Sequence, residues 1–249
     1  MQQRLARFCF AAAFASPKLR YAARAMATSG QATCSGKALI FLHGLGDTPA
    51  GWSSLERQLP SLIGNLEGAK YVFPAAPTIP ISINGGAEMP GWFDVLDWPI
   101  GITARDDRKG LLAAVNQIEK EVETLGEKGI APSDIVVGGF SQGGAVALLA
   151  AYHQRQNKVP FAGCVVLSGW LTLEEDLSVA ELVKQQTPLF WAHGQYDDKV
   201  LFEQQSHGVQ KLLDLGVDVQ HSSYPMGHSS HPQETAAMAA FIEKCLSSN

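Results

Sequence analysis

The residues that decide the fold are 135–149, which read IVVGGFSQGGAVALL. A β-branched apolar run leads into two glycines, a serine follows, and a run rich in Ala and Leu comes after it. The first run favours a strand and the last favours a helix. Residues 139–143 fit the pattern G-x-S-x-G, which places its serine on an exposed corner when it joins a strand to a helix. The stretch therefore predicts that Ser141 is a nucleophile on a strained turn.

The glycines beside Ser141 have a physical reason. A strand and a helix that meet at so sharp a corner must approach closely, and residues without Cβ allow this. The backbone N–H of Gln142 would then lie at the helix N-terminus, where negative charge is stabilised. We therefore predict that Gln142 supplies one donor of an oxyanion hole.

A second donor is predicted from an upstream turn. Residues 38–43 (ALIFLH) have the length and composition of a buried strand, and His43-Gly44-Leu45-Gly46-Asp47 turns out of it. Hydrolases of this layout place the second oxyanion donor in such a turn. Leu45 N–H is the candidate, and an ordinary tight turn is the alternative.

Composition bounds the class of protein. The chain has 249 residues, of which 46% are hydrophobic and 17% charged, which suits a globular domain with a substantial core. Net charge is −5, but the first 46 residues hold six Lys and Arg and no acid, so the remainder carries −11. An acidic body argues against nucleic-acid binding. No apolar run is long enough for a transmembrane segment, although transient membrane contact is compatible with the sequence.

Residues 1–35 are expected to form a basic extension before a domain at 36–249. Residues 1–27 are rich in Ala and Arg and free of acids, which is typical of a transit peptide. The alternatives are a disordered tail and translation from Met26. The predicted location is accordingly cytoplasmic, or mitochondrial or plastid if the extension is a transit peptide. Lipid modification of Cys9 is left open.

The four cysteines, Cys9, Cys34, Cys164 and Cys245, lie far apart and form no C-x-x-C pair. This spacing favours a reducing compartment and argues against a metal site. Cys164 falls in a strand pattern and Cys245 on a helix face, so both are predicted to be small core residues. No pair of His or carboxylate residues has metal-ligand spacing either, and no cofactor is predicted.

Strand patterns alternate with helical patterns along the chain. Expected strands are 38–43, 71–73, 135–140, 163–167, 188–192 and 217–224, and expected helices are 51–63, 111–125, 142–155, 202–215 and one at the C-terminus. Pro60 is expected to end or kink the first helix. This alternation predicts an α/β fold, with a mostly parallel central sheet and helices on both faces.

Residues 74–101 are expected to be irregular, because they contain five prolines and several glycines. So long a loop is uncommon in a compact domain and is often functional. Its aromatics Trp92 and Phe93, together with Trp170 after a later strand, are candidate substrate-binding residues. They either wall an acyl pocket or hold a loop against the core, and the sequence favours neither.

Three candidate catalytic residues follow strands in the order Ser141, Asp197, His228. Active groups of an open α/β sheet gather at the carboxyl ends of its strands, and this order is that of an α/β-hydrolase. His228 would accept the serine proton near neutral pH, and Asp197 would orient the imidazole. Asp198 is the alternative acid, otherwise expected in a solvated turn or at a helix N-cap. His221 and His231 are weaker candidates for the base.

The assembled residues resemble the acyl-protein thioesterases of the phospholipase/carboxylesterase family over roughly residues 36–247. The matching motifs are Phe41-Leu42-His43-Gly44-Leu45-Gly46-Asp47-Thr48, Met89-Pro90-Gly91-Trp92-Phe93-Asp94, Gly138-Gly139-Phe140-Ser141-Gln142-Gly143-Gly144, His193-Gly194 with Asp197, and Gly227-His228-Ser229. The resemblance implies an α/β-hydrolase fold without a cofactor. It favours Asp197 over Asp198 and supports Leu45 and Gln142 as the oxyanion pair. The chain departs from the family pattern at Leu201, where a proline is common, and at residues 105–109.

The predicted function is hydrolysis of long-chain acyl thioesters or esters through an acyl-enzyme, with acylated proteins or lysophospholipids as substrates. The enzyme alternative is a broad carboxylesterase. The alternative from another class is a hydrolase-fold receptor with little turnover. The chain is expected to be a monomer or weak homodimer.

Overall fold

The computed structural model describes residues 36–63, 66, 68–153, 158–177 and 187–247. The predicted N-terminal extension, residues 1–35 with Cys9 and Cys34, lies outside the described residues. Among those described, no helix combines the length and the apolar character needed to cross a bilayer.

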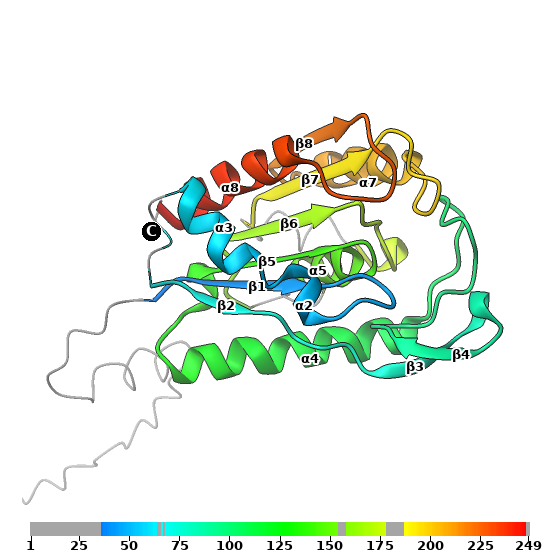
Figure 1. Ribbon diagram of the computed structural model, residues 1–249, viewed down its shortest axis with the longest axis horizontal. Helices are drawn as coiled ribbons and strands as arrows, with labels where there is room; N and C mark the ends of the chain where they lie inside the picture. Colours follow the sequence, from blue (N-terminus) through cyan, green and yellow to red (C-terminus); the bar gives the residue numbers. More distant parts are fainter. Residues whose placement is uncertain (1–35, 64–65, 67, 154–157, 178–186, 248–249) are drawn as a thin grey trace, which may run out of the picture. The chain divides into compact units, whose positions relative to one another are not determined.

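A parallel sheet of six strands forms the centre of the domain (Figure 1). In spatial order the strands are β2 (Lys70–Val72), β1 (Ala38–Leu42), β5 (Ile135–Phe140), β6 (Gly163–Leu167), β7 (Leu189–Gly194) and β8 (Val219–Tyr224). Every neighbouring pair runs parallel. The predicted parallel α/β architecture is therefore confirmed, and all the strands end at one edge.

Alternate residues of the strands face two separate cores. In β1, Ala38, Ile40 and Leu42 pack into one apolar cluster, whereas Leu39 and Phe41 pack into the other. The same alternation divides β5, β6 and β7, because successive side chains of a strand point to opposite faces. Strands buried on both faces read as continuous apolar runs, which is why β1, β6 and β7 were recognisable in the sequence.

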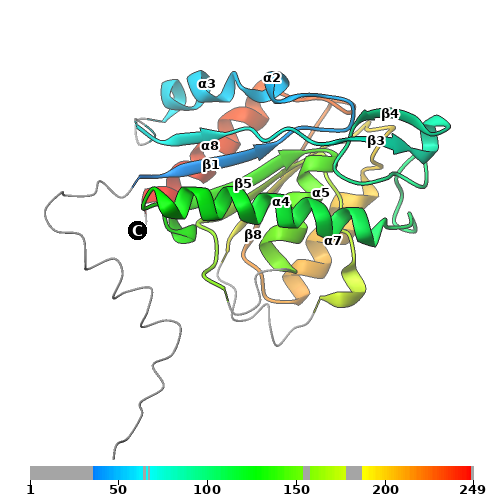
Figure 2. The ribbon, with the colours of Figure 1, turned by 90° about the horizontal axis from the view of Figure 1, so that it is seen from below.

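Helices cover both faces of the sheet (Figure 2). One face carries α4 (Arg108–Glu127), α5 (Gln142–Tyr152) and α7 (Glu203–Asp214), and the other carries α2 (Pro49–Trp52), α3 (Leu55–Leu62) and α8 (Pro232–Ser247). Asp107 caps α4 by accepting a hydrogen bond from Gly110 N–H at 3.0 Å. The predicted apolar stripe of this helix is buried throughout.

Two expectations about local structure were wrong. The predicted helix at 51–63 is two short helices, and Pro60 lies inside the second of them without ending it. Residues 74–101 are not wholly irregular, because β3 (Thr78–Ile81) and β4 (Ala87–Pro90) pair as an antiparallel hairpin. This hairpin lies beyond the carboxyl ends of the central strands (Figure 1). The predicted core positions of Cys164 and Cys245 are confirmed, since both are buried free thiols.

Glu234 is a fully buried carboxyl group in the first turn of α8. Its Oε2 accepts a long hydrogen bond from His231 N–H at 3.4 Å, and its Oε1 has no partner among the described residues. Burial raises the pKa of Glu234 to about 7, because water no longer stabilises the carboxylate, and the bond from His231 opposes this only in part. The folded protein therefore binds a proton here that the unfolded chain releases at lower pH.

We predict that Glu234→Gln stabilises the fold at high pH only. Between the ordinary pKa of 4.5 and about 7, the stability of the wild type falls as pH rises, because the folded state must give up a proton that it binds more tightly. At pH 8 the variant should gain up to about 3 kcal/mol in free energy of unfolding. The gain should vanish near pH 4.5. Denaturant unfolding at both pH values measures it, with Glu243→Gln on the same helix as the control; an equal gain at both pH values would contradict the prediction.

Candidate active site

Ser141 stands at the corner between β5 and α5. Its backbone has φ 54° and ψ −122°, a conformation that non-glycine residues rarely adopt. The corner is held by a 2.8 Å hydrogen bond from Ser141 N–H to Leu167 O on the neighbouring strand. Such strain persists only where the surrounding structure fixes it, and it concentrates at functional sites. The predicted strand–serine–helix turn is confirmed as a local structure.

The glycines around Ser141 permit the close approach that this corner needs. A Cβ on Gly139 would lie 2.4 Å from the backbone of Gly143, and a Cβ on Gly143 would lie 2.3 Å from Leu42 O. Both distances are shorter than any tolerated contact. The start of α5 is thus in close contact with the end of β1. The turn at His43-Gly44-Leu45-Gly46-Asp47 follows directly after this strand.

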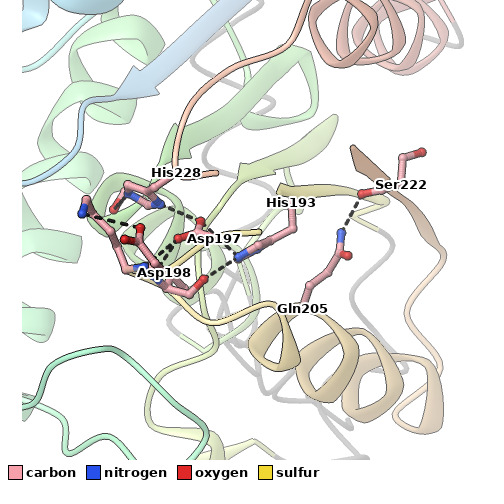
Figure 3. Close-up of polar contacts among 9 residues, drawn as sticks. His193, Asp197, Asp198, Gln205, Ser222 and His228 are labelled. Carbon is pink, nitrogen blue, oxygen red and sulfur yellow. Dashed lines mark hydrogen bonds and ion pairs between the residues drawn. The ribbon is translucent and has the colours of Figure 1, made fainter. Parts of the chain in front are cut away.

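The structure brings Ser141, His228 and Asp197 together from three strand ends. His228 Nε2 lies 2.8 Å from Ser141 Oγ. On its other side, His228 Nδ1 lies 2.7 Å from Asp197 Oδ2 (Figure 3). The ring of His228 rests on that of Phe140, with centroids 4.8 Å apart. An imidazole bonded to a hydroxyl on one side and to a carboxylate on the other can move a proton between serine and substrate.

Asp197 is buried, and several hydrogen-bond donors surround its carboxylate. Its Oδ1 accepts hydrogen bonds from the N–H groups of Lys199 and Val200 at 2.9 and 3.0 Å. Burial by itself would raise the pKa of Asp197, but hydrogen bonds from His193 and His228, the attraction of His228 and the bond from Lys199 N–H together hold that pKa well below its ordinary value. The group is therefore a carboxylate across the neutral range.

The acid turn and the histidine loop touch directly through backbone. Gln195 N–H donates to Tyr224 O at 2.8 Å, and Tyr196 N–H donates to Met226 O at 3.0 Å. A Cβ on Gly194 would lie 2.4 Å from Gly227 O, so this contact also requires a glycine. Chain segments some thirty residues apart are thus held at a fixed spacing.

The alternative candidates lie elsewhere. The side chain of Asp198 is 79% exposed and 3.6 Å from Lys199 Nζ. It lies in an exposed turn, which was one of its two predicted positions; it is not a helix N-cap, because α7 begins at Glu203 with Phe202 in the cap position. His221 is exposed on β8, and the ring of His231 stacks on Tyr224.

The turn that carries Leu45 lies against Ser141. A Cβ on Gly44 would lie 3.3 Å from Ser141 Cβ. Among the described residues, no acceptor bonds to the backbone N–H of Leu45 or of Gln142. Two N–H groups without an acceptor therefore belong to the segments next to Ser141, which is compatible with an oxyanion hole.

The sequence profile of the phospholipase/carboxylesterase family matches residues 26–246. The chain belongs to the phospholipase/carboxylesterase family. As a member of this family it is a hydrolase of ester or thioester bonds.

Related proteins agree with the family assignment. Acyl-protein thioesterase 1 of Gibberella zeae is 37% identical, over 84% of this chain and 90% of that protein. The crystal structure of Arabidopsis thaliana SOBER1 superposes with a TM-score of 0.74 at 29% identity, covering 84% of this chain and 99% of that one. Acyl-protein thioesterase 2 of Zea mays superposes with a TM-score of 0.73 at 29% identity, covering 88% and 96%. These likenesses confirm the predicted α/β-hydrolase fold.

Hydrogen bonds connect the side chain of Gln142 to residues 92–93, and from there to the strand end at His43. Its Oε1 accepts a hydrogen bond from Trp92 N–H at 2.8 Å, and its Nε2 donates to Phe93 O at 2.6 Å. The indole Nε1 of Trp92 in turn donates to His43 O at 2.8 Å, beside the Leu45 turn. The sequence indicated only the backbone of Gln142; its side-chain role could not be found there, because the partners lie about fifty residues away.

The predicted substrate-binding aromatics are all buried. Trp92 holds a loop against the core, which was one of its two predicted roles. The rings of Phe93 and Trp170 meet edge to face, with centroids 5.7 Å apart, and line a cavity of about 10 Å³ beneath residues 93–105. That volume holds about one water molecule. A more open groove of about 490 Å³ runs along α7 and includes none of the site candidates.

The segment 105–109, where a departure from the family pattern was expected, makes polar contacts with two other loops. Arg105 pairs with Asp97 at 2.9 Å, and Arg108 pairs with Asp176. Asp106 accepts a 2.7 Å hydrogen bond from Leu173 N–H. No group of three or more His, Cys, Asp or Glu in the described part of the chain could hold a metal ion.

We predict that Gln142→Ala lowers both stability and activity. The buried Trp92 N–H and Phe93 O would lose their partners, which should reduce the free energy of unfolding by roughly 2–4 kcal/mol. The rate of ester hydrolysis should also fall, since the loop next to the Leu45 turn is released. Gln117→Ala is a matched control, because Gln117 also donates to a backbone carbonyl, of Ala75, but at a more exposed position. Equal effects of the two substitutions on stability and rate would contradict the prediction.

Proposed function

We propose that this enzyme is an acyl-protein thioesterase that works through an acyl-enzyme on Ser141. One observation carries the proposal: the hydrogen-bonded series from Asp197 through His228 to Ser141 Oγ, beside two N–H groups that have no acceptor among the described residues. The names of the related thioesterases support the substrate class. Acylated proteins are therefore the proposed substrates, and lysophospholipids are the alternative.

In the first half-reaction, Ser141 Oγ attacks the acyl carbon while His228 Nε2 takes the hydroxyl proton. The carbonyl oxygen becomes an oxyanion and accepts hydrogen bonds from the N–H groups of Leu45 and Gln142. When the tetrahedral species collapses, His228 gives its proton to the departing sulfur or oxygen. The products are the acyl-enzyme and a free thiol or alcohol.

In the second half-reaction, water hydrolyses the acyl-enzyme, and His228 again transfers the proton. His228 takes a proton from water as it attacks the acyl carbon, and then returns that proton to Ser141 Oγ. Asp197 stays ionised throughout and stabilises the imidazolium in both halves. The fatty acid and the free serine are released.

We also propose that Phe93 and Trp170 contact the acyl chain of the substrate. Their cavity of about 10 Å³ is too small for an acyl chain as it stands. An acyl chain that reaches these rings would have to displace residues 93–105, whose end at Arg105 is exposed and anchored by an ion pair.

Ser141→Ala is expected to abolish hydrolysis without unfolding the protein. Loss of the nucleophile of such a triad should lower kcat by at least about 10⁴-fold. The assay gives wild type and variant a palmitoylated peptide and, separately, a lysophospholipid. Ser61→Ala, an exposed serine on α3, is the matched control and should keep the wild-type rate.

The outcomes of this assay separate the alternatives. Release from the peptide by wild type but not by Ser141→Ala supports the thioesterase, and release only from the lysolipid contradicts the proposed substrate. Retained hydrolysis in Ser141→Ala contradicts the assignment of the nucleophile. No release from either substrate, with poor labelling by a fluorophosphonate probe, would instead support a receptor.

Acyl-chain length should separate a long-chain enzyme from a broad carboxylesterase. Each methylene buried in a pocket contributes about 0.8 kcal/mol, or roughly a fourfold rise in kcat/KM. We expect kcat/KM for matched thioesters to rise from C4 to C16. A maximum at C4 to C6, followed by a decline, would favour the carboxylesterase.

A further inference from the structure

A second histidine lies against the carboxylate of the site. His193 is in β7, four residues before Asp197, and it is fully buried. Figure 3 shows Asp197 between the rings of His228 and His193. We propose that His193 is a positioning residue, which fixes the Asp197 carboxylate in the orientation that His228 needs. This inference rests on the proposed function, because it concerns the same triad.

The contacts of His193 close a small loop around the carboxylate. His193 Nε2 lies 2.8 Å from Val200 O and 3.4 Å from Asp197 Oδ2. A carbonyl oxygen only accepts, so Nε2 carries the hydrogen. Val200 N–H donates to Asp197 Oδ1 at 3.0 Å. Val200 therefore links the two side chains. Its carbonyl oxygen accepts a hydrogen bond from His193, and its N–H donates one to Asp197.

The ring of His193 is suited to position the carboxylate without competing for protons. Its Nδ1 is buried and has no partner among the described residues. A proton there would be a buried donor without an acceptor, which is unfavourable. The edge of the Phe202 ring packs beside it, with centroids 6.1 Å apart, and Asp197 is the ionisable group in contact with it. A ring that donates through Nε2 alone orients the carboxylate and leaves the proton transfer to His228.

Loss of His193 would have two opposing effects on the imidazolium of His228. The distances from His193 Nε2 to Asp197 Oδ2 and to Val200 O decide which effect is larger. Removal of the contact with Oδ2 would by itself leave more negative charge for His228, but at 3.4 Å this contact is long. The bond to Val200 O is short, and its loss would free the loop that aligns the carboxylate. Misalignment should dominate, and the imidazolium of His228 should become less stable.

The decisive substitutions are His193→Phe and His193→Gln. Phenylalanine keeps a ring of similar size without a donor, whereas glutamine restores an N–H donor on a side chain of similar length. His221→Phe makes the same change on the neighbouring strand, at an exposed position away from the triad. Active enzyme is counted by fluorophosphonate titration, so that poorly folded protein does not lower the measured kcat.

In His193→Phe, kcat should fall tenfold to a hundredfold, the range of a hydrogen bond to a charged group, with KM within twofold of wild type. The acidic limb of the pH–rate profile should move to lower pH. His193→Gln should recover most of the rate, and His221→Phe should match wild type. Wild-type kcat per active site and an unchanged acidic limb in His193→Phe would overturn the proposal, even if its Tm falls, because His193 would then serve stability alone.

A second measurement needs no turnover and separates failure here from failure of the proposed function. NMR titration of the His228 imidazole should give a lower pKa in His193→Phe than in wild type, and an intermediate or wild-type value in His193→Gln. An unchanged titration of His228 in His193→Phe overturns the positioning role. Inactivity of the wild type towards every ester and thioester would contradict only the proposed function.

Discussion

The close contact between the start of α5 and the end of β1 is the constraint on which the site depends. Gly143 lies so near Leu42 O that no side chain fits between them. This contact forces Ser141 into a backbone conformation that it would not adopt alone, and it presents the hydroxyl at the carboxyl edge of the sheet. It also brings the N–H of Gln142 beside the turn that carries Leu45. The candidate nucleophile and the candidate oxyanion donors are thus brought together by one packing contact.

The second half of the site is built around a buried charge. Asp197 is removed from water, which by itself is unfavourable, and four neighbouring groups compensate for the lost hydration. Two of these are backbone N–H groups of its own turn, and two are histidine rings on either side of Oδ2. The carboxylate is consequently held in one orientation before any substrate arrives. Such preorganisation is what electrostatic catalysis requires.

The loops beyond the sheet are joined to this centre by hydrogen bonds of long sequence separation. Gln142 connects the corner of Ser141 to Trp92 and Phe93, and the indole of Trp92 connects back to His43. These hydrogen bonds fix the loops next to Ser141 through residues outside the candidate triad. Of the aromatics for which the sequence left two roles open, Trp92 is part of this support through its indole.

The sequence by itself determined the parallel sheet, the strand–serine–helix corner and the order of the catalytic candidates. These are encoded locally, by apolar runs buried on both faces and by glycines next to Ser141. It also indicated that Cys164 and Cys245 are core thiols. The distinction between Asp197 and Asp198 needed a family resemblance, because adjacent acids have the same local pattern. Only the tertiary structure decided the contacts of His193, Trp92 and the Gln142 side chain, since a hydrogen bond between distant segments has no signature in either one.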